Sequence, residues 1–185
     1  MNNNINLTIN EVFSLAVKNH QEGKTDIALK LYNQILKIEP NHSQSLNNLG
    51  VIFQNQMNHE KAKDYYEKAI EIKSDYEEAH NNLGNIFKEL GDNQKAKECY
   101  EKAIAINPNN ANAHSNLSVI FKTLKDYQKA IDCVEKAIEL NPNYSQAHNN
   151  LGVIFKDLRE YEKAKSCYEK AIDLKPDYAD AHNNL

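Results

Sequence analysis

A spacing of 34 residues between rare residue types is the feature that most constrains this chain. It appears in four histidines, three cysteines and three prolines: His80, His114, His148 and His182; Cys99, Cys133 and Cys167; Pro108, Pro142 and Pro176. A single globular core does not require such a spacing, whereas a tandem repeat does. We predict five units, residues 9–42, 43–76, 77–110, 111–144 and 145–178, after a leader of residues 1–8. Residues 179–185 begin a sixth unit.

Each unit contains two apolar patterns of helical period. In the fifth unit, Leu151, Ile154 and Leu158 recur at steps of three and four, and Tyr161 to Leu174 repeats this pattern before Pro176. Small residues recur where paired helices approach closely, at Gly50, Gly84, Ser118 and Gly152 in the first helix and at Ala62, Ala96, Ala130 and Ala164 in the second. The sequence therefore predicts an all-α array of helix pairs.

Charge and hydropathy exclude several classes of protein. The net charge is -4, and nucleic-acid-binding domains usually carry a strongly basic face. No apolar run is long enough to cross a bilayer, so we expect no membrane partner. The Asn-rich start has no apolar signal region, which favours a cytoplasmic location where the three cysteines stay reduced.

The 34-residue unit resembles the tetratricopeptide repeat (TPR), with Leu-Gly in its first helix, Ala and Tyr in its second and Pro at its end. The resemblance covers residues 9–185. It implies a right-handed superhelical solenoid of antiparallel helix pairs whose first helices line a groove for peptides.

Both ends of the array depart from the pattern. The first unit has Asn19 where later units have Phe, and we expect this polar residue on the outer face of a terminal unit. The last seven residues stop within a first helix. We expect either that the natural protein continues beyond Leu185 or that this end packs on another chain, which includes self-association.

Numbering each unit from its first residue, positions 2, 5, 6, 9, 12 and 13 of the first helix are predicted to face outward. Position 6 is always Asn after the first unit, and position 9 is mostly Val. Asn can pair with a peptide backbone of any sequence, and Val adds an apolar contact. We predict peptide-binding residues at Asn48, Asn82, Asn116 and Asn150 and at Val51, Asn85, Val119 and Val153, with a basic row at Lys88, Lys122 and Lys156 that favours an acidic peptide.

A simpler explanation is that the units are recent copies, in which every position repeats. Position 2 argues against it, because it varies among Gln44, Glu78, Asn112, Gln146 and Asp180 while Asn persists at position 6.

The run His-Asn-Asn-Leu-Gly at 80–84 and 148–152 resembles the repeat arrays of protein O-linked N-acetylglucosamine transferases, in which such an Asn holds the substrate backbone. This resemblance implies an alternative function, the substrate-recognition arm of a larger glycosyltransferase. The carboxylate clamp of chaperone-binding repeats is rejected, because positions 2 and 6 hold no Lys or Arg.

The histidines and cysteines that recur every 34 residues do not predict a metal site or a disulfide. Equivalent residues of successive units lie a helix pair apart, too far to share one metal ion or a disulfide. We interpret the histidines as filling an aromatic slot between helices and the cysteines as small packing residues. No catalytic residue, metal or cofactor is predicted, and the leading function is a scaffold that binds a protein or peptide.

Overall fold

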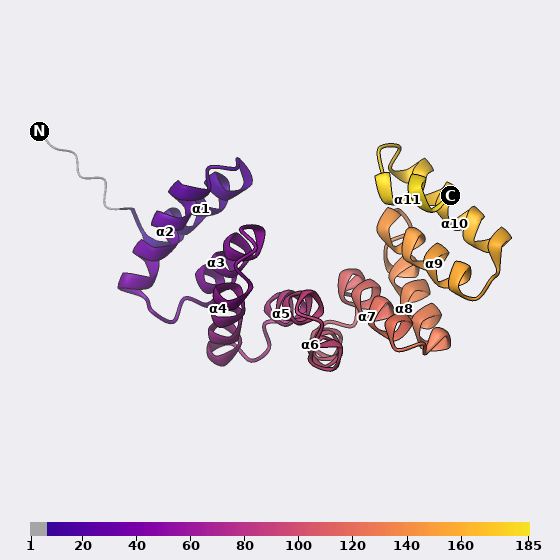
Figure 1. The fold of residues 1–185 in the computed structure, drawn as a ribbon. Helices are drawn as coiled ribbons and strands as arrows, with labels where there is room; N and C mark the ends of the chain where they lie inside the picture. The colour runs from indigo at the N-terminus through magenta and orange to yellow at the C-terminus, as the bar shows by residue number, and fades with distance from the viewer. Residues whose placement is uncertain (1–6) are drawn as a thin grey trace, which may run out of the picture. The chain divides into compact units, whose positions relative to one another are not determined.

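The computed structural model describes residues 7–185, and every regular element among them is a helix (Figure 1). The helices are α1 (Ile9–Gln21), α2 (Thr25–Ile38), α3 (Ser43–Asn55), α4 (His59–Ile72), α5 (Glu77–Glu89), α6 (Asn93–Ile106), α7 (Ala111–Thr123), α8 (Tyr127–Leu140), α9 (Ser145–Asp157), α10 (Tyr161–Leu174) and α11 (Ala179–Asn184). The predicted all-α array of helix pairs is confirmed. Of the predicted leader, residues 1–6 lie outside the described residues, and Leu7 and Thr8 precede α1.

Short polar turns set where the helices begin. Thr8 and Glu11 form a capping box at α1. Asp92, Asp126 and Asn110 accept hydrogen bonds from backbone N–H groups at the starts of α6, α8 and α7. These side chains satisfy amides that have no partner within the helix.

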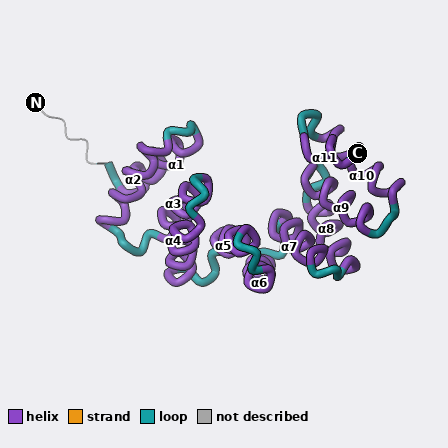
Figure 2. The backbone as a smooth tube through the Cα atoms, viewed as in Figure 1, coloured by secondary structure: helices purple, strands orange, loops and turns teal. Residues whose placement is uncertain are grey.

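The turn inside each helix pair contains one residue with positive φ. Glycine supplies it at Gly23 and Gly91, with φ of 73° and 80°. Met57, Lys125 and Arg159 take the same conformation at φ of 58°, 61° and 62°. A left-handed residue after the first helix reverses the chain within a few residues (Figure 2). The second helix then packs back on the first in the pairs α1–α2, α3–α4, α7–α8 and α9–α10.

The described chain divides within α5 into two compact parts, residues 7–86 and Phe87–Leu185, and each is described by itself. In the first part, α1 packs on α2 and α3 on α4, and α2 also contacts α3. Its largest core cluster lies between these helices and includes Ala16, Ala28, Tyr32, Leu49 and Ile52.

The second part repeats this arrangement. Helix α7 packs on α8 and α9 on α10, while α6 contacts α7 and α8 contacts α9. Its core cluster contains Tyr100, Leu117, Ile120, Val134 and Ile154. Apolar side chains of neighbouring units thus share one core, as stacked repeats require.

The glycines at position 8 admit a tyrosine ring from the second helix. A Cβ atom on Gly50 would lie 2.5 Å from Cε1 of Tyr66, and one on Gly152 would lie 2.5 Å from Cε1 of Tyr168. Unit 111–144 has Ser118 at the glycine position and Val134 at the tyrosine position, both fully buried. The prediction that small residues allow close helix approach is confirmed for Gly50 and Gly152.

Asn19 corrects one expectation. It lies in the body of α1 with 9% of its surface exposed, rather than on an outer face. Its Nδ2 donates to the carbonyl of Leu15 at 2.7 Å. The amide is tolerated because the preceding helical turn supplies an acceptor.

None of the helices within residues 7–185 is both long and apolar enough to cross a bilayer.

Candidate functional site

Most of the residues predicted to bind a peptide are at least partly accessible in the structure, and Asn116 is buried. We call the side chains at positions 6, 9 and 12 of α3, α5, α7 and α9 the first-helix face. Its asparagines Asn48, Asn82 and Asn150 are partly buried, while Asn116 is 9% exposed. Val51, Asn85, Val119 and Val153 are also partly buried. The helical period brings these positions to one side of each helix.

Position 5 does not belong to the outward face, which corrects the sequence prediction. Asn47 and Ser115 are fully buried, and Asn81 and Asn149 are 9% and 6% exposed. The prediction placed position 5 by the helical angle alone. In the structure the following first helix contacts position 5 of α3, α7 and α9, because stacked units bury one flank of a first helix.

The asparagines of position 6 form hydrogen bonds between successive units. Asn82 Nδ2 donates to Asn47 Oδ1 at 3.2 Å. In the second part, Asn150 Nδ2 donates to Ser115 Oγ at 3.1 Å, and Asn184 Nδ2 donates to Asn149 Oδ1 at 3.1 Å. Position 6 of one unit therefore holds position 5 of the unit before it. One donor of each of these amides stabilises the stack.

Tyrosines complete this network. Asn48 Nδ2 donates to the hydroxyl of Tyr32 at 3.1 Å. The phenol of Tyr76 lies near Asn47, and that of Tyr144 lies near Ser115. Sequence reasoning missed these partners of position 5. The persistence of Asn or Ser at position 5 was the signal that could have revealed them.

Four of the predicted residues line one pocket between α7 and α9. Val119 and Lys122 come from α7, and Asn150 and Val153 from α9. Ser118 and Ile154 complete the lining of this cavity of about 170 Å³. Its walls are aliphatic, and an ammonium, a hydroxyl and a carboxamide stand among them. We call it the α7–α9 pocket.

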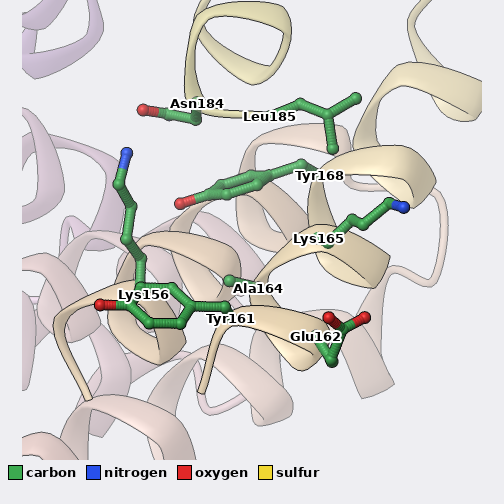
Figure 3. Close-up of a pocket in the computed structure, with 8 residues that line it drawn as sticks. All are labelled: Lys156, Tyr161, Glu162, Ala164, Lys165, Tyr168, Asn184 and Leu185. Carbon is green, nitrogen blue, oxygen red and sulfur yellow. The ribbon is translucent and has the colours of Figure 1, made fainter. Parts of the chain in front are cut away.

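A second pocket, of about 400 Å³, lies among α9, α10 and α11. Figure 3 shows that the ring of Tyr168 occupies its centre and directs the hydroxyl to the side where Lys156 and Asn184 lie. That hydroxyl is buried and makes no hydrogen bond to the described residues. Tyr168, at position 24 of its unit, thus fills the space between Lys156, at position 12 of the same unit, and Asn184, at position 6 of the next unit.

The three lysines of position 12 differ in their surroundings. Lys88 and Lys122 are partly buried, whereas Lys156 is exposed. Burial lowers the pKa of Lys88, and the nearby Glu89 carboxylate partly opposes this effect. In unit 43–76 the same position is Gln54, whose Oε1 accepts from the hydroxyl of Tyr66 at 2.9 Å.

The histidine column stabilises the loops between units. Nε2 of His80, His114 and His148 donates to the carbonyl six residues earlier, at 3.0 Å in each case. These rings are partly exposed, and His182, which bonds Pro176 in the same way, is exposed. The predicted aromatic slot is therefore wrong as a buried site. The ring lies at the surface because its polar nitrogen serves the loop carbonyl.

The cysteines are free thiols that are partly buried. Burial raises the pKa of Cys133 to about 11, and nearby carboxylates add to the effect. Within residues 7–185 no group of three or more His, Cys, Asp or Glu side chains is placed to hold a metal ion.

Comparison with known families identifies the repeat. The tetratricopeptide repeat profile matches residues 43–76, 77–110, 111–144 and 145–178, which is most of the chain. The chain belongs to the tetratricopeptide repeat family. TPR units are built for protein–protein contact, and the chain is a scaffold of this class. None of the curated proteins gives a significant match to its sequence.

Solved TPR structures share the fold. The crystal structure of MamA has a TM-score of 0.73 and 24% identity, covering 89% of this chain and 96% of that one. YrrB, described as a TPR protein with an unusual peptide-binding site, has a TM-score of 0.71 and 21% identity, with coverage of 95% and 91%. PilF of Pseudomonas aeruginosa has a TM-score of 0.79 and 21% identity, covering 95% of this chain and 88% of PilF.

Proposed function

We propose that this TPR chain binds an extended peptide segment of a partner protein along its first-helix face. The α7–α9 pocket is the observation that carries the proposal. Val119, Lys122, Asn150 and Val153 were selected by their period in the sequence, and they line one accessible cavity. An extended chain places alternate side chains on one side, so one of them can enter this cavity while its neighbours point to solvent.

The asparagines serve this function in part. One donor of Asn150 is engaged by Ser115, so the amide is held in a fixed orientation. A peptide N–H can then be accepted by Asn150 Oδ1, and the carboxamide loses little side-chain entropy on binding because it is already ordered. Asn184 and Asn82 are held in the same way within their own parts of the chain.

The lysines favour an acidic peptide. Lys122 lines the α7–α9 pocket, and Lys156 stands one unit further along the same face. Carboxylates of a bound peptide would gain charge-assisted hydrogen bonds from these ammonium groups, which are stronger than neutral ones. A peptide ligand for a chain of this fold is supported by YrrB, which is described as a TPR protein with an unusual peptide-binding site.

Selection of linear peptides from a displayed random library tests the proposal. Fluorescence polarisation with a selected peptide should then show a Kd about tenfold weaker for the Lys122→Glu/Lys156→Glu variant. The matched control reverses two exposed lysines, Lys102→Glu/Lys170→Glu, on α6 and α10. It carries the same net charge and should bind as the unmodified chain does. Equal weakening in both variants, or no enrichment of peptides, would contradict the proposal.

Two alternatives to this function are also proposed. The first is that the chain is the substrate-recognition arm of a larger enzyme, such as an O-linked N-acetylglucosamine transferase-like glycosyltransferase. The gene sequence beyond codon 185 tests this proposal.

The second is self-association through the end formed by α10 and α11. Light scattering over a dilution series tests it, and a constant monomer mass at high concentration would contradict it.

A further inference from the structure

Position 24 of the repeat is Tyr in four units and Val in one. Tyr32, Tyr66, Tyr100 and Tyr168 are buried with at most 2% of their surface exposed. Val134 replaces this tyrosine in unit 111–144 and is fully buried. The substitution is matched at position 8, where Ser118 replaces the glycine that makes room for the tyrosine ring.

The tyrosine rings of units 9–42, 43–76 and 145–178 lie among related positions, although unit 9–42 has Ala16 at position 8 and the hydroxyl of Tyr168 makes no hydrogen bond to the described residues. Tyr66 contacts Gly50 at position 8 and donates to Gln54 at position 12. Tyr32 accepts a hydrogen bond from Asn48, position 6 of the next unit. Tyr168 lies between Lys156 and Asn184, which occupy positions 12 and 6 (Figure 3). Positions 8, 12 and 6 therefore surround the phenol.

In unit 111–144 the same three positions line the α7–α9 pocket, as Ser118, Lys122 and Asn150. Valine is shorter than tyrosine by most of an aromatic ring and its hydroxyl. The cavity of about 170 Å³ is comparable to a protein cavity of about 150 Å³ that holds benzene. The pocket thus has the size for one ring and the polar groups that meet a phenol elsewhere in the chain.

We propose that the α7–α9 pocket is a specificity pocket that receives a tyrosine side chain of the bound peptide. This inference rests on the proposed peptide-binding function and names the residue that the peptide must supply. The ring lies against Val119, Val153 and Ile154, and its hydroxyl meets Lys122 and Asn150. The partner's tyrosine takes the place that the chain's own tyrosine fills in the other units.

The probe for the pocket is p-cresol, which is the tyrosine side chain as a free molecule. Titration of the chain with p-cresol, followed by the NMR signals of the Val119, Val153 and Ile154 methyl groups, should give saturable shifts with a Kd on the order of 1 mM. Toluene, which lacks the hydroxyl, should bind more weakly. Absence of saturable shifts at these three residues would overturn the proposal.

Restoring the repeat pattern should close the pocket. The Val134→Tyr/Ser118→Gly variant places the chain's own ring there and should weaken p-cresol binding about tenfold or more. Val153→Phe is a second variant, for use if the first one fails to fold. It lies at a partly exposed position, fills the rim of the pocket without altering the core, and should also weaken p-cresol binding. Unchanged p-cresol binding in a folded variant of either kind would overturn the proposal.

The reverse exchange is the matched control. Tyr66→Val/Gly50→Ser recreates the Val134 and Ser118 pair in unit 43–76 and should add a second p-cresol site, read from the methyl groups of Val51 and Ile86. Failure of a folded variant to gain this site would show that the Val and Ser pair does not make the pocket.

Peptide measurements separate this inference from the proposed function. Peptides selected on the chain should contain a tyrosine, and its replacement by Ala should weaken binding about tenfold, with Phe intermediate. Selected peptides that bind the first-helix face without any tyrosine dependence would overturn the pocket assignment and leave the proposed function standing. Saturable p-cresol binding without any enriched peptide would overturn the peptide-binding function instead.

Discussion

Asn82 donates from its Nδ2 to Oδ1 of Asn47, which lies one unit earlier and is fully buried. The bond joins the first helices α3 and α5 within the first part of the chain. The same relationship between positions 6 and 5 joins α7 to α9 and α9 to α11. One N–H group of each bonded asparagine amide therefore holds successive units together, and the other polar atoms of the amide can serve a ligand.

Asn82→Ala should lower the stability of the chain. The substitution removes the donor to a buried oxygen, so the free energy of unfolding should fall by about 1–3 kcal/mol. Urea denaturation followed by circular dichroism measures the change. Asn55→Ala, at an exposed position of α3, is the control and should alter stability little. Equal midpoints for Asn82→Ala and the unmodified chain would contradict a structural role for the ladder.

Gly152→Ala should destabilise α9 against α10. The added Cβ would lie 2.5 Å from Cε1 of Tyr168, which is 2% exposed, so the ring would have to shift within the packed core. Overpacking of this kind costs about 1–3 kcal/mol. In a Tyr168→Val background the same substitution should cost much less, as the Ser118 and Val134 pair indicates. A thermal-denaturation double-mutant cycle measures this coupling, and additive effects would refute it.

Lys125→Gly should stabilise the turn between α7 and α8. Lys125 has φ of 61°, a conformation that costs an L-residue about 1–2 kcal/mol and glycine almost nothing. Part of this gain is offset by the greater entropy of glycine in the unfolded chain, which leaves about 0.5–1 kcal/mol. Gly91→Lys, the reverse change in the turn between α5 and α6, should lower the melting temperature. Opposite signs from these predictions would show that the turns are not strained.

Tyr76 should make the chain sensitive to alkali. Burial raises the pKa of its phenol from about 10 to about 12, with the charge of Glu78 adding to the effect. Between these values the unfolded chain releases a proton that the folded chain keeps, so the contribution is intact below pH 10 and is lost as pH rises to 12. Urea midpoints over this range should fall less for Tyr76→Phe than for the unmodified chain. Parallel declines would contradict the assignment.

Much of the fold could be predicted from the residue spacing. The period of 34 residues and the two apolar patterns in each unit determine helix pairs, because each helix must bury one apolar stripe. The same period selected Val119, Lys122, Asn150 and Val153, which lie around one pocket. The small residue at position 8 was also predictable, although its partner, the tyrosine ring at position 24, was not.

The remaining features depend on contacts between units. The helical angle placed Asn47 and Ser115 on the outward face, yet neighbouring first helices bury them. The histidine column looked like buried packing, yet each ring reaches a loop carbonyl. A helical period describes directions around one helix and says nothing about which flank the next unit will cover.

The sequence by itself determined the repeat, the helix pairs and the set of residues on the first-helix face, because these follow from local periodicity. The tertiary structure alone decided which amides join successive units and that Ser118, Lys122 and Asn150 line a cavity beside a unit whose tyrosine is replaced by Val134. The physical reason is that a cavity and a buried hydrogen bond arise from side chains far apart in the sequence, and only packing brings them within contact distance.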